Sequence, residues 1–250
     1  MDKTPLRRCL AIAVKAAQRA GEYLAGQKSA TQIIDASFAH DLKLRADRDS
    51  ERLVIDHLRK HTAFSILSEE RGMLKGSDEK YCWVVDPLDG TINYFHQLPL
   101  SCVCIALCVG GQPKLGVIYD FHRQELFTGI VGEGAWLNGR RMRVSSVAKK
   151  REAVMATGFP GKDKVSVAEI NLFARHVRTY KKVRLLGSAA LSMAYVAAGR
   201  LDAYFEKDIW LWDVAAGVAI VRAAAGKAIL TAPDKSYMCE VFAHNGKLGK

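Results

Sequence analysis

One segment of the chain reads as a buried strand, yet it ends in two acids. Residues 81–95 are YCWVVDPLDGTINYF, in which mostly apolar residues lead to Asp86, and Pro87 and Asp89 follow. Pro87 lacks a backbone donor and fixes its own φ, so we expect the strand to stop there. Acids are usually excluded from interiors unless their charge is offset. A chain that places two carboxylates at the end of a buried strand must therefore supply something that compensates them.

The residues after this strand suit a cation and a phosphate group. Asp86 and Asp89 offer hard oxygen ligands, which Mg²⁺ prefers. Gly90 permits tight geometry, and the backbone N–H groups from Thr91 onward would point forward from the start of a short helix, an arrangement that suits an anion. Asp-Pro and Asp-Gly are also common turn dipeptides, so this segment alone leaves a purely structural turn open.

Length and composition narrow the class of protein. The chain has 250 residues, enough for one large core or two lobes that share an interface. Its 49% hydrophobic and 25% charged content is that of a soluble globular protein rather than a disordered one. No apolar stretch is long enough to span a bilayer, and the start, MDKTPLRRCL, lacks signal-peptide features. We therefore expect a cytoplasmic protein with no membrane partner.

The cysteines are best explained as core residues. Six cysteines in a chain of this length do not suggest a disulfide framework. Cys102, Cys104 and Cys108 lie within SCVCIALCVGG, a strand-like run, whereas structural zinc sites place their ligands at tight spacings in loops. Packing in a strand is therefore favoured over a zinc site.

The chain is basic. It carries 37 Lys and Arg against 26 Asp and Glu, a formal net charge of +11. The basic residues gather at 140–143, 149–151 and 181–184. This excess suits anionic substrates or weak nucleic-acid contact, while a solvated surface remains open for any single cluster.

Hydrophobic periodicity predicts an α+β first half and an α/β second half. In the first half we expect helices at 4–26 and 47–61, a hairpin from segments near 33–34 and 42–44, and strands at 64–67, 81–85, 102–109, 114–119 and 125–131. In the second half helices at 166–178, 188–198 and 212–225 alternate with strands at 183–186 and 201–205. The change near residues 144–152 predicts an N-terminal α+β part, residues 1–145, and a C-terminal α/β part, residues 146–250.

Three further acids stand at the ends of predicted elements. Glu69 ends a strand in ILSEERG, and Asp213 stands at the start of a helix in WLWDVAAG. Asp47 opens the second predicted helix. Asp47 and Asp213 would also serve as helix N-caps, so each alone leaves a structural role open.

Together these segments resemble one family closely. ILSEER, DPLDGTINYF and WDVAAG match, in order, the signatures of the inositol monophosphatase family. The segments DLKLRADRDSE, GEGAWLNGRRMRVS and LLGSAALSMAYVAAGRLDAYFE extend the resemblance over nearly the whole chain. The resemblance implies a layered αβαβα sandwich of the inositol monophosphatase/fructose-1,6-bisphosphatase type, usually a homodimer.

The resemblance also implies the site residues. Two or three Mg²⁺ ions would be held by Glu69, Asp86, the carbonyl of Leu88, Asp89 and Asp213. Catalysis would rest on Asp47 and Thr91, which orient the attacking water, and on Glu69. The substrate would contact the N–H groups of Gly90 and Thr91, then Gly187, Ser188 and Ala189, and finally Glu206, which accepts hydrogen bonds from substrate hydroxyls. Because Ala36 and Ser37 stand where relatives often carry Lys, a third ion is left open.

The implied reaction is Mg²⁺-dependent hydrolysis of a small phosphate monoester by a metal-activated water. Ile92-Asn93-Tyr94 looks more like the inositol monophosphatase branch, which favours inositol 1-phosphate as the substrate. Fructose 1,6-bisphosphate, histidinol phosphate and adenosine 3′,5′-bisphosphate remain alternatives. A different class, an RNA- or polymerase-associated regulator, also stays open because a bacterial relative has such a second role, although no aromatic–basic RNA-binding pattern favours it.

Overall fold

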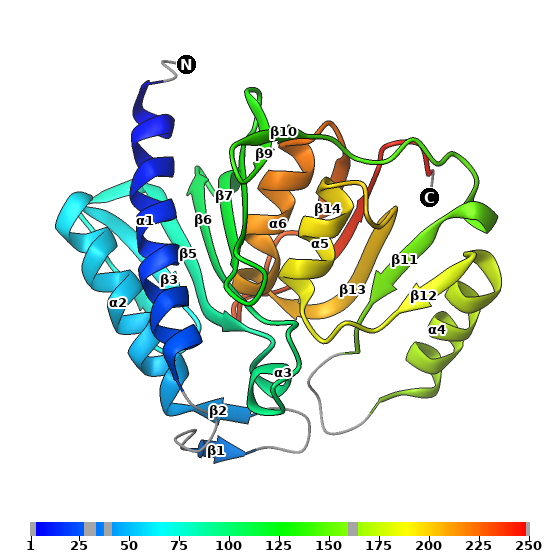
Figure 1. The fold of residues 1–250 in the computed structure, drawn as a ribbon, viewed down its shortest axis with the longest axis horizontal. Coiled ribbons are helices and arrows are strands. Elements are labelled where there is room, and N and C mark those ends of the chain that lie inside the picture. Colours follow the sequence, from blue (N-terminus) through cyan, green and yellow to red (C-terminus); the bar gives the residue numbers. More distant parts are fainter. Residues whose placement is uncertain (1–3, 28–33, 38–41, 160–164, 249–250) are drawn as a thin grey trace.

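The computed structural model describes residues 4–27, 34–37, 42–159 and 165–248, arranged in five layers (Figure 1). Helices α1 (Thr4–Gly26) and α2 (Arg45–His61) cover the outer face of an eight-stranded sheet. Helices α5 (Ala189–Ala197) and α6 (Leu211–Ala223) lie between that sheet and a five-stranded sheet, and α4 (Val167–Thr179) covers the far side. The predicted αβαβα sandwich is confirmed.

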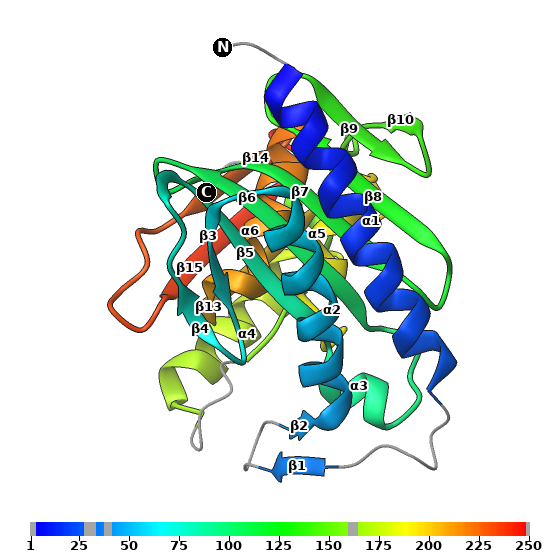
Figure 2. The ribbon, with the colours of Figure 1, turned by 90° about the vertical axis from the view of Figure 1, so that its left-hand side faces the viewer.

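The eight-stranded sheet has the order β10-β9-β8-β7-β6-β5-β3-β4 and is antiparallel except where β3 runs parallel to β5. Figure 2 shows α1 and α2 lying across its outer face. All eight residues of β6 are buried, as expected for a strand covered by helices on both faces. The strands are β3 (Phe64–Ser68), β4 (Gly72–Leu74), β5 (Asp78–Asp89), β6 (Cys102–Val109), β7 (Gln112–Asp120), β8 (Glu125–Ile130), β9 (Gly134–Leu137) and β10 (Arg140–Met142).

The five-stranded sheet has the order β12-β11-β13-β15-β14, with β11 parallel to both of its neighbours. Its strands are β11 (Val154–Thr157), β12 (Lys182–Arg184), β13 (Ala203–Trp210), β14 (Lys227–Leu230) and β15 (Met238–His244). Three short elements complete the described fold: the hairpin of β1 (Ile34–Ser37) and β2 (Leu42–Leu44), the helix α3 (Thr91–Phe95), and a 3₁₀ turn, η2 (Lys150–Glu152).

Helix α6 joins the two sheets. It is apolar nearly all round and buried along most of its length, as a helix between two sheets must be. Gly116 in β7 lets its backbone approach closely, because a Cβ there would collide with the carbonyl oxygen of Ala216. This close packing places Asp213, in the first turn of α6, near the end of β5. The chain passes from one sheet to the other between β10 and β11, and the division at residue 145 stays a prediction.

The sequence interpretation was wrong at Pro87 and at the two predicted N-caps. β5 does not stop at Pro87 but continues to Asp89, because its pairing with β6 shifts register between Asp86 and Asp89 and so accommodates the proline. Asp47 and Asp213 are not N-caps. Each lies in the first turn of its helix and accepts the backbone N–H of the residue three positions earlier.

Among the helices that the structure describes, none combines the length and the apolar character that a bilayer span requires.

Candidate active site

A cavity of about 490 Å³ opens where the two sheets meet α3, α5 and α6. It gathers predicted site residues from segments far apart in the chain. Those that line it are Glu69, Asp86, Leu88, Asp89, Gly90, Thr91, Gly187, Ser188, Ala189, Glu206 and Asp213. Asp47 is the one predicted residue that does not line it, because it is buried behind Thr91.

The end of β5 is fixed by hydrogen bonds within the turn and from α2. Asp86 Oδ1 accepts the backbone N–H of Leu88 at 2.9 Å. The hydroxyl of Ser50, in α2, donates to the carbonyl of Pro87 at 2.8 Å. Gly90 has φ 83°, and a Cβ there would collide with the carbonyl of Leu100, so glycine is required on both counts.

Asp89 is held both by the start of α5 in the second half of the chain and by the neighbouring strand β6. Its Oδ2 accepts hydrogen bonds from the hydroxyl of Ser188, from the backbone N–H of Ala190 at 3.3 Å and from the Cys102 thiol at 3.4 Å. These donors fix the direction of the carboxylate, which also lines the cavity. The side chain therefore reaches the cavity in one orientation.

Thr91 and Asp47 form a pair that can handle a water and its proton. The Thr91 hydroxyl lies 3.1 Å from Asp47 Oδ1 and 3.0 Å from the carbonyl of Leu88, and its single hydrogen is shared between them. Its oxygen is thus left to accept a hydrogen bond from a water in the cavity. Burial raises the pKa of Asp47 to about 7, so this carboxyl can take up a proton near neutral pH.

The carboxyl groups of the cavity repel one another. Burial raises the pKa of Asp86 well above its usual value, and the charges of Glu69, Asp89 and Asp213 raise it further. The pKa of Asp213 is raised in the same way, while the pKa of Asp89 rises to about 6, again mainly through burial. A divalent cation among these oxygens would remove the repulsion, and hard carboxylate oxygens are the donors that Mg²⁺ prefers. The residues therefore fit a Mg²⁺ site.

Two thiols lie beside this site without belonging to the same donor set. Ligand atoms of Asp89, Cys102 and Cys104 lie within 4.8 Å of one another. Burial raises the pKa of Cys102 to about 12, so this thiol keeps its proton and donates a hydrogen bond to Asp89. Neither cysteine is among the described residues that line the cavity. They are buried within β6, as the sequence predicted.

Glu206 stands on the wall formed by β13. It is not beyond the strand, as expected from the sequence, but within it, just before a register shift that ends at Ile209. The hydroxyl of Tyr204 donates to Glu206 Oε2 at 2.5 Å. A Cβ at Gly158 would collide with the Glu206 carboxyl, so the glycine makes room for it.

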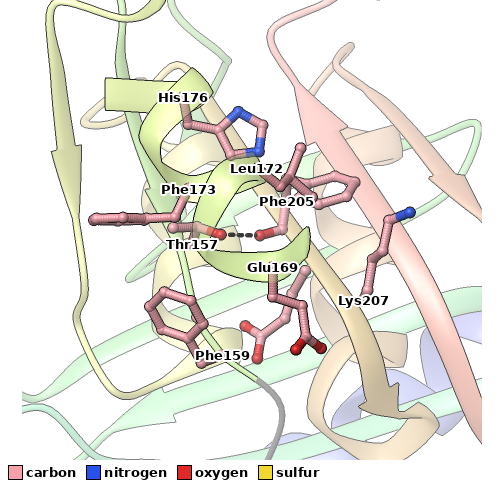
Figure 3. Close-up of a pocket in the computed structure, with 10 residues that line it drawn as sticks. Thr157, Phe159, Glu169, Leu172, Phe173, His176, Phe205 and Lys207 are labelled. Carbon is pink, nitrogen blue, oxygen red and sulfur yellow. Dashed lines mark hydrogen bonds between the residues drawn. The ribbon is translucent and has the colours of Figure 1, made fainter. Parts of the chain in front are cut away.

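Glu206 also lines a second, smaller pocket, whose other side chains are shown in Figure 3. Its volume of about 30 Å³ is enough for a water molecule but not for a substrate. Phe159, Phe173 and Phe205 line it, together with Leu172. Burial raises the pKa of Glu206 to about 7, although the hydrogen bond from Tyr204 acts in the opposite direction.

Sequence reasoning missed two residues that position the site. Glu51, in α2, is buried and accepts hydrogen bonds from the Ser68 hydroxyl at 2.5 Å and from the backbone N–H groups of Glu70 and Arg71, so it holds the turn that carries Glu69. The spacing Asp47-Ser50-Glu51, which puts three polar residues on one helix face, is a signal that could have found it.

The other missed residue is Asn93. Its Nδ2 lies 2.9 Å from the carbonyl of Leu100, 2.8 Å from that of Leu186 and 3.1 Å from that of Gly187. The last two contacts tie α3 to the segment that leads into α5. No local sequence signal marks this role, since the partners lie far away in the chain.

The family model that describes the inositol monophosphatase family matches residues 6–245. The chain belongs to the inositol monophosphatase family. It is 41% identical over 221 residues to Nus factor SuhB of Escherichia coli K12, covering 87% of this chain and 83% of that protein. It is 39% identical over 251 residues to an inositol-1-monophosphatase of Synechocystis, covering 97% and 86%.

A solved structure gives the same result. The inositol monophosphatase from Anabaena superposes with a TM-score of 0.83 at 39% identity, covering 97% of this chain and 92% of that one. The protein is thus a phosphatase of a metal-dependent family whose members act on small phosphate substrates. The predicted family is confirmed.

Proposed function

We propose that the protein is a Mg²⁺-dependent phosphomonoesterase that hydrolyses a small polyol phosphate, with inositol 1-phosphate as the first candidate. One observation carries the proposal. The cavity brings Glu69, from the turn after β3, together with acids of β5 and α6, and it is also lined by Glu206 of β13, which we take as the opposite wall. The first wall suits cations and a phosphate group, and the second suits the hydroxyls of an alcohol.

Glu69, Asp86, Asp89, Asp213 and the carbonyl of Leu88 would hold two or three Mg²⁺ ions. When bound, the ions would make a water acidic at neutral pH and neutralise the charge of the phosphate and of the departing alkoxide. The four carboxylates would balance the charge of the ions, which answers why a buried strand ends in acids.

The chain's own groups would orient the reactants. The Thr91 oxygen would accept a hydrogen bond from the attacking water, while Asp47 accepts from the Thr91 hydroxyl and would take up the proton released. The N–H groups of Gly90 and Thr91 would donate to phosphate oxygens. Gly187, Ser188 and Ala189 would line the substrate, and Glu206 would accept hydrogen bonds from its hydroxyls.

The test is phosphate release from a panel of esters, with Mg²⁺ or with a chelator. The panel holds inositol 1-phosphate, fructose 1,6-bisphosphate, histidinol phosphate and adenosine 3′,5′-bisphosphate. We expect hydrolysis only with Mg²⁺ and the highest kcat/KM on inositol 1-phosphate. Activity that survives chelation would overturn the metal mechanism, whereas a higher kcat/KM on another ester would correct the substrate alone.

A regulatory role is a second candidate. Two observations favour it: the relative in Escherichia coli is named a Nus factor, and this chain carries a net charge of +11. RNA binding measured against salt tests the role. Tight, sequence-selective RNA binding that survives physiological salt would support the regulatory role. RNA binding that disappears with added salt would instead indicate non-specific electrostatic attraction.

The assembly and the compartment complete the proposal. We infer a homodimer located in the cytoplasm, on the family resemblance and on the sequence. Light scattering during size-exclusion chromatography tests the first inference, and cell fractionation tests the second. A monomer at working concentration would exclude the dimer.

A further inference from the structure

The cavity has a third kind of surface, an apolar rim, that the proposed chemistry does not use. Trp210 is 38% exposed, Ile92 44% and Leu185 55%, and all three line the cavity. They come from different segments: the end of β13, α3, and the segment that follows β12. Large apolar side chains that converge on one cavity while remaining exposed mark a surface that a ligand covers.

Trp210 is the most informative of the three, because a tryptophan is costly to leave in water. Its ring stacks on that of Trp212, with centroids 5.0 Å apart and an interplanar angle of 7°. One face of the indole is thus covered by Trp212, which is itself largely buried. The rest of the Trp210 ring stays exposed, and its tilt is fixed by the stacking on Trp212.

The backbone also holds this ring in place. Trp210 pairs with Met238 of β15, and the next residue, Leu211, donates its N–H to the carbonyl of Tyr237 at 2.9 Å. The N–H of Trp210 donates to Asp213 Oδ2 at 3.3 Å. The indole therefore has a fixed position relative to a carboxylate of the proposed metal site. A preformed position of this kind reduces the entropy that is lost on binding.

Trp210 shares a strand and a cavity wall with Glu206. A carboxylate suits the hydroxyl edge of a polyol, and a flat aromatic surface suits the C–H face of a saturated ring. An open-chain alcohol offers hydroxyls to the carboxylate but no rigid face to the indole. The two side chains together therefore select for the shape of the alcohol as well as for its polarity.

We propose that Trp210 is a specificity-determining residue that stacks against the ring of the substrate's alcohol, so that the enzyme prefers phosphate monoesters of ring-shaped polyols to those of open-chain alcohols. This inference rests on the proposed phosphatase activity and names the class of alcohol that the same site takes. Cyclitols and cyclic sugars share the required C–H face.

The test compares inositol 1-phosphate with glycerol 2-phosphate, an open-chain ester, for the wild type, Trp210→Ala and Trp210→Phe. For Trp210→Ala we expect kcat/KM on inositol 1-phosphate to fall about tenfold, mainly through KM, and that on glycerol 2-phosphate to change less than about twofold. Trp210→Phe keeps a flat ring and should recover most of the loss. Trp136→Ala, in β9 and outside the cavity, is the matched control and should change neither substrate.

A Mg²⁺ titration separates stacking from damage to the metal site, since the N–H of Trp210 contacts Asp213. We expect the Mg²⁺ concentration for half-maximal rate to be unchanged in both Trp210 variants. Equal losses on the two esters, or a shifted Mg²⁺ dependence, would overturn the inference and make Trp210 a support of the metal site. Unchanged kinetics on both esters would overturn it as well.

The proposed function fails in a different way. If the wild-type protein releases no phosphate from either ester with Mg²⁺ present, the phosphatase proposal itself is wrong. If the wild type is active and only the substrate contrast at Trp210 is missing, the stacking inference alone is wrong.

Discussion

The two walls of the cavity are built differently. On the side of the eight-stranded sheet, hydrogen bonds within the turn and from α2 fix the acidic residues, such as Leu88 N–H to Asp86 and Ser50 to Pro87. On the side of the five-stranded sheet, β13 carries two carboxylates, Glu206 and Asp208, and one exposed aromatic ring, Trp210, around a register shift. We propose that the first wall carries out the reaction and that the second distinguishes one alcohol from another.

A few contacts connect the walls. Ser188 donates to Asp89, and Asn93 donates to the carbonyls of Leu186 and Gly187. We therefore expect substitutions of side chains on β13 to change substrate preference more than metal binding, whereas substitutions at the contacts between the walls should affect both binding and chemistry.

The largest effect is expected on the acidic wall. Asp89→Asn removes a charge where cations are proposed to bind, so kcat should fall by about 10³-fold or more on every ester. Steady-state rates on inositol 1-phosphate and on an aryl phosphate measure it. Asp56→Asn, an exposed acid of α2, is the matched control and should keep full activity.

Thermal unfolding shows whether this loss comes from the metal site or from the fold. Without metal, Asp89→Asn should be at least as stable as the wild type, because it relieves repulsion at Asp86 and Asp213. With Mg²⁺, the wild type should gain more in Tm than the variant. A well-folded variant with undiminished activity would break the division between the walls.

The second effect is on the stability of the metal-free protein. The pKa values of Asp47, Asp89 and Glu206 are raised to about 7, 6 and 7. At any pH between the ordinary pKa of such a carboxyl and its raised pKa, the folded state binds more protons than the unfolded chain. The free energy of unfolding should therefore fall as the pH rises from about 4 to about 7.

Mg²⁺ should remove the part of this fall that comes from Asp89, since bound cations favour its ionised carboxylate. Histidines whose pKa values are lowered by burial of the ring act in the opposite direction over part of the range, namely the buried His57 and His244 and the more accessible His122 and His176. The measurement is therefore the difference between chemical denaturation with chelator and with Mg²⁺ at each pH. A difference that does not grow with pH would contradict the assignment of the acidic wall to cations.

Sequence reasoning found the local part of this site. Asp86, Asp89 and Gly90 are adjacent in the chain, and β6 matches its predicted range because an unbroken apolar run is a strong signal. The distant acids, Glu69 and Asp213, were placed in one site only through the family resemblance. Residue spacing alone does not predict that a strand end and a helix start far apart in the chain lie close together in the fold.

The missed features are non-local or irregular. The strands β14 and β15 contain polar residues such as Lys227 and Glu240, which obscure a strand pattern. β5 continues beyond Pro87 because its pairing with β6 shifts register. Residue propensities do not predict such a shift. Asn93 bonds to carbonyls that follow it by more than 90 positions, at Leu186 and Gly187. Physical contacts of this kind depend on the assembled layers.

The third effect tests the selective wall. Glu206→Gln should raise KM for inositol 1-phosphate about tenfold, because a charged acceptor of substrate hydroxyls is lost. The same change should leave an aryl phosphate nearly unaffected, since that ester has no hydroxyl to bind. Tyr204→Phe is the matched control: it removes the 2.5 Å hydrogen bond to Glu206 but keeps the carboxylate, so its effect should be smaller. Equal losses on both esters would place Glu206 in support of the metal site or the fold.

The smallest effect concerns the surface beyond both walls. The net charge of +11 should attract phosphate esters before they reach the cavity, whichever alcohol they carry. Salt screens this attraction over a Debye length of about 10 Å at 0.1 M, so kcat/KM should fall about two- to threefold with added salt while kcat stays constant. Inositol 1-phosphate and glycerol 2-phosphate carry the same phosphate charge and should lose equally. Electrostatic attraction depends on the charge of the ester, whereas the β13 wall is proposed to recognise the shape of its alcohol. A salt effect on kcat/KM for only one of the two esters would therefore mean that charge also contributes to substrate preference. In that case the sharp division between an acidic wall for chemistry and a β13 wall for recognition would no longer hold.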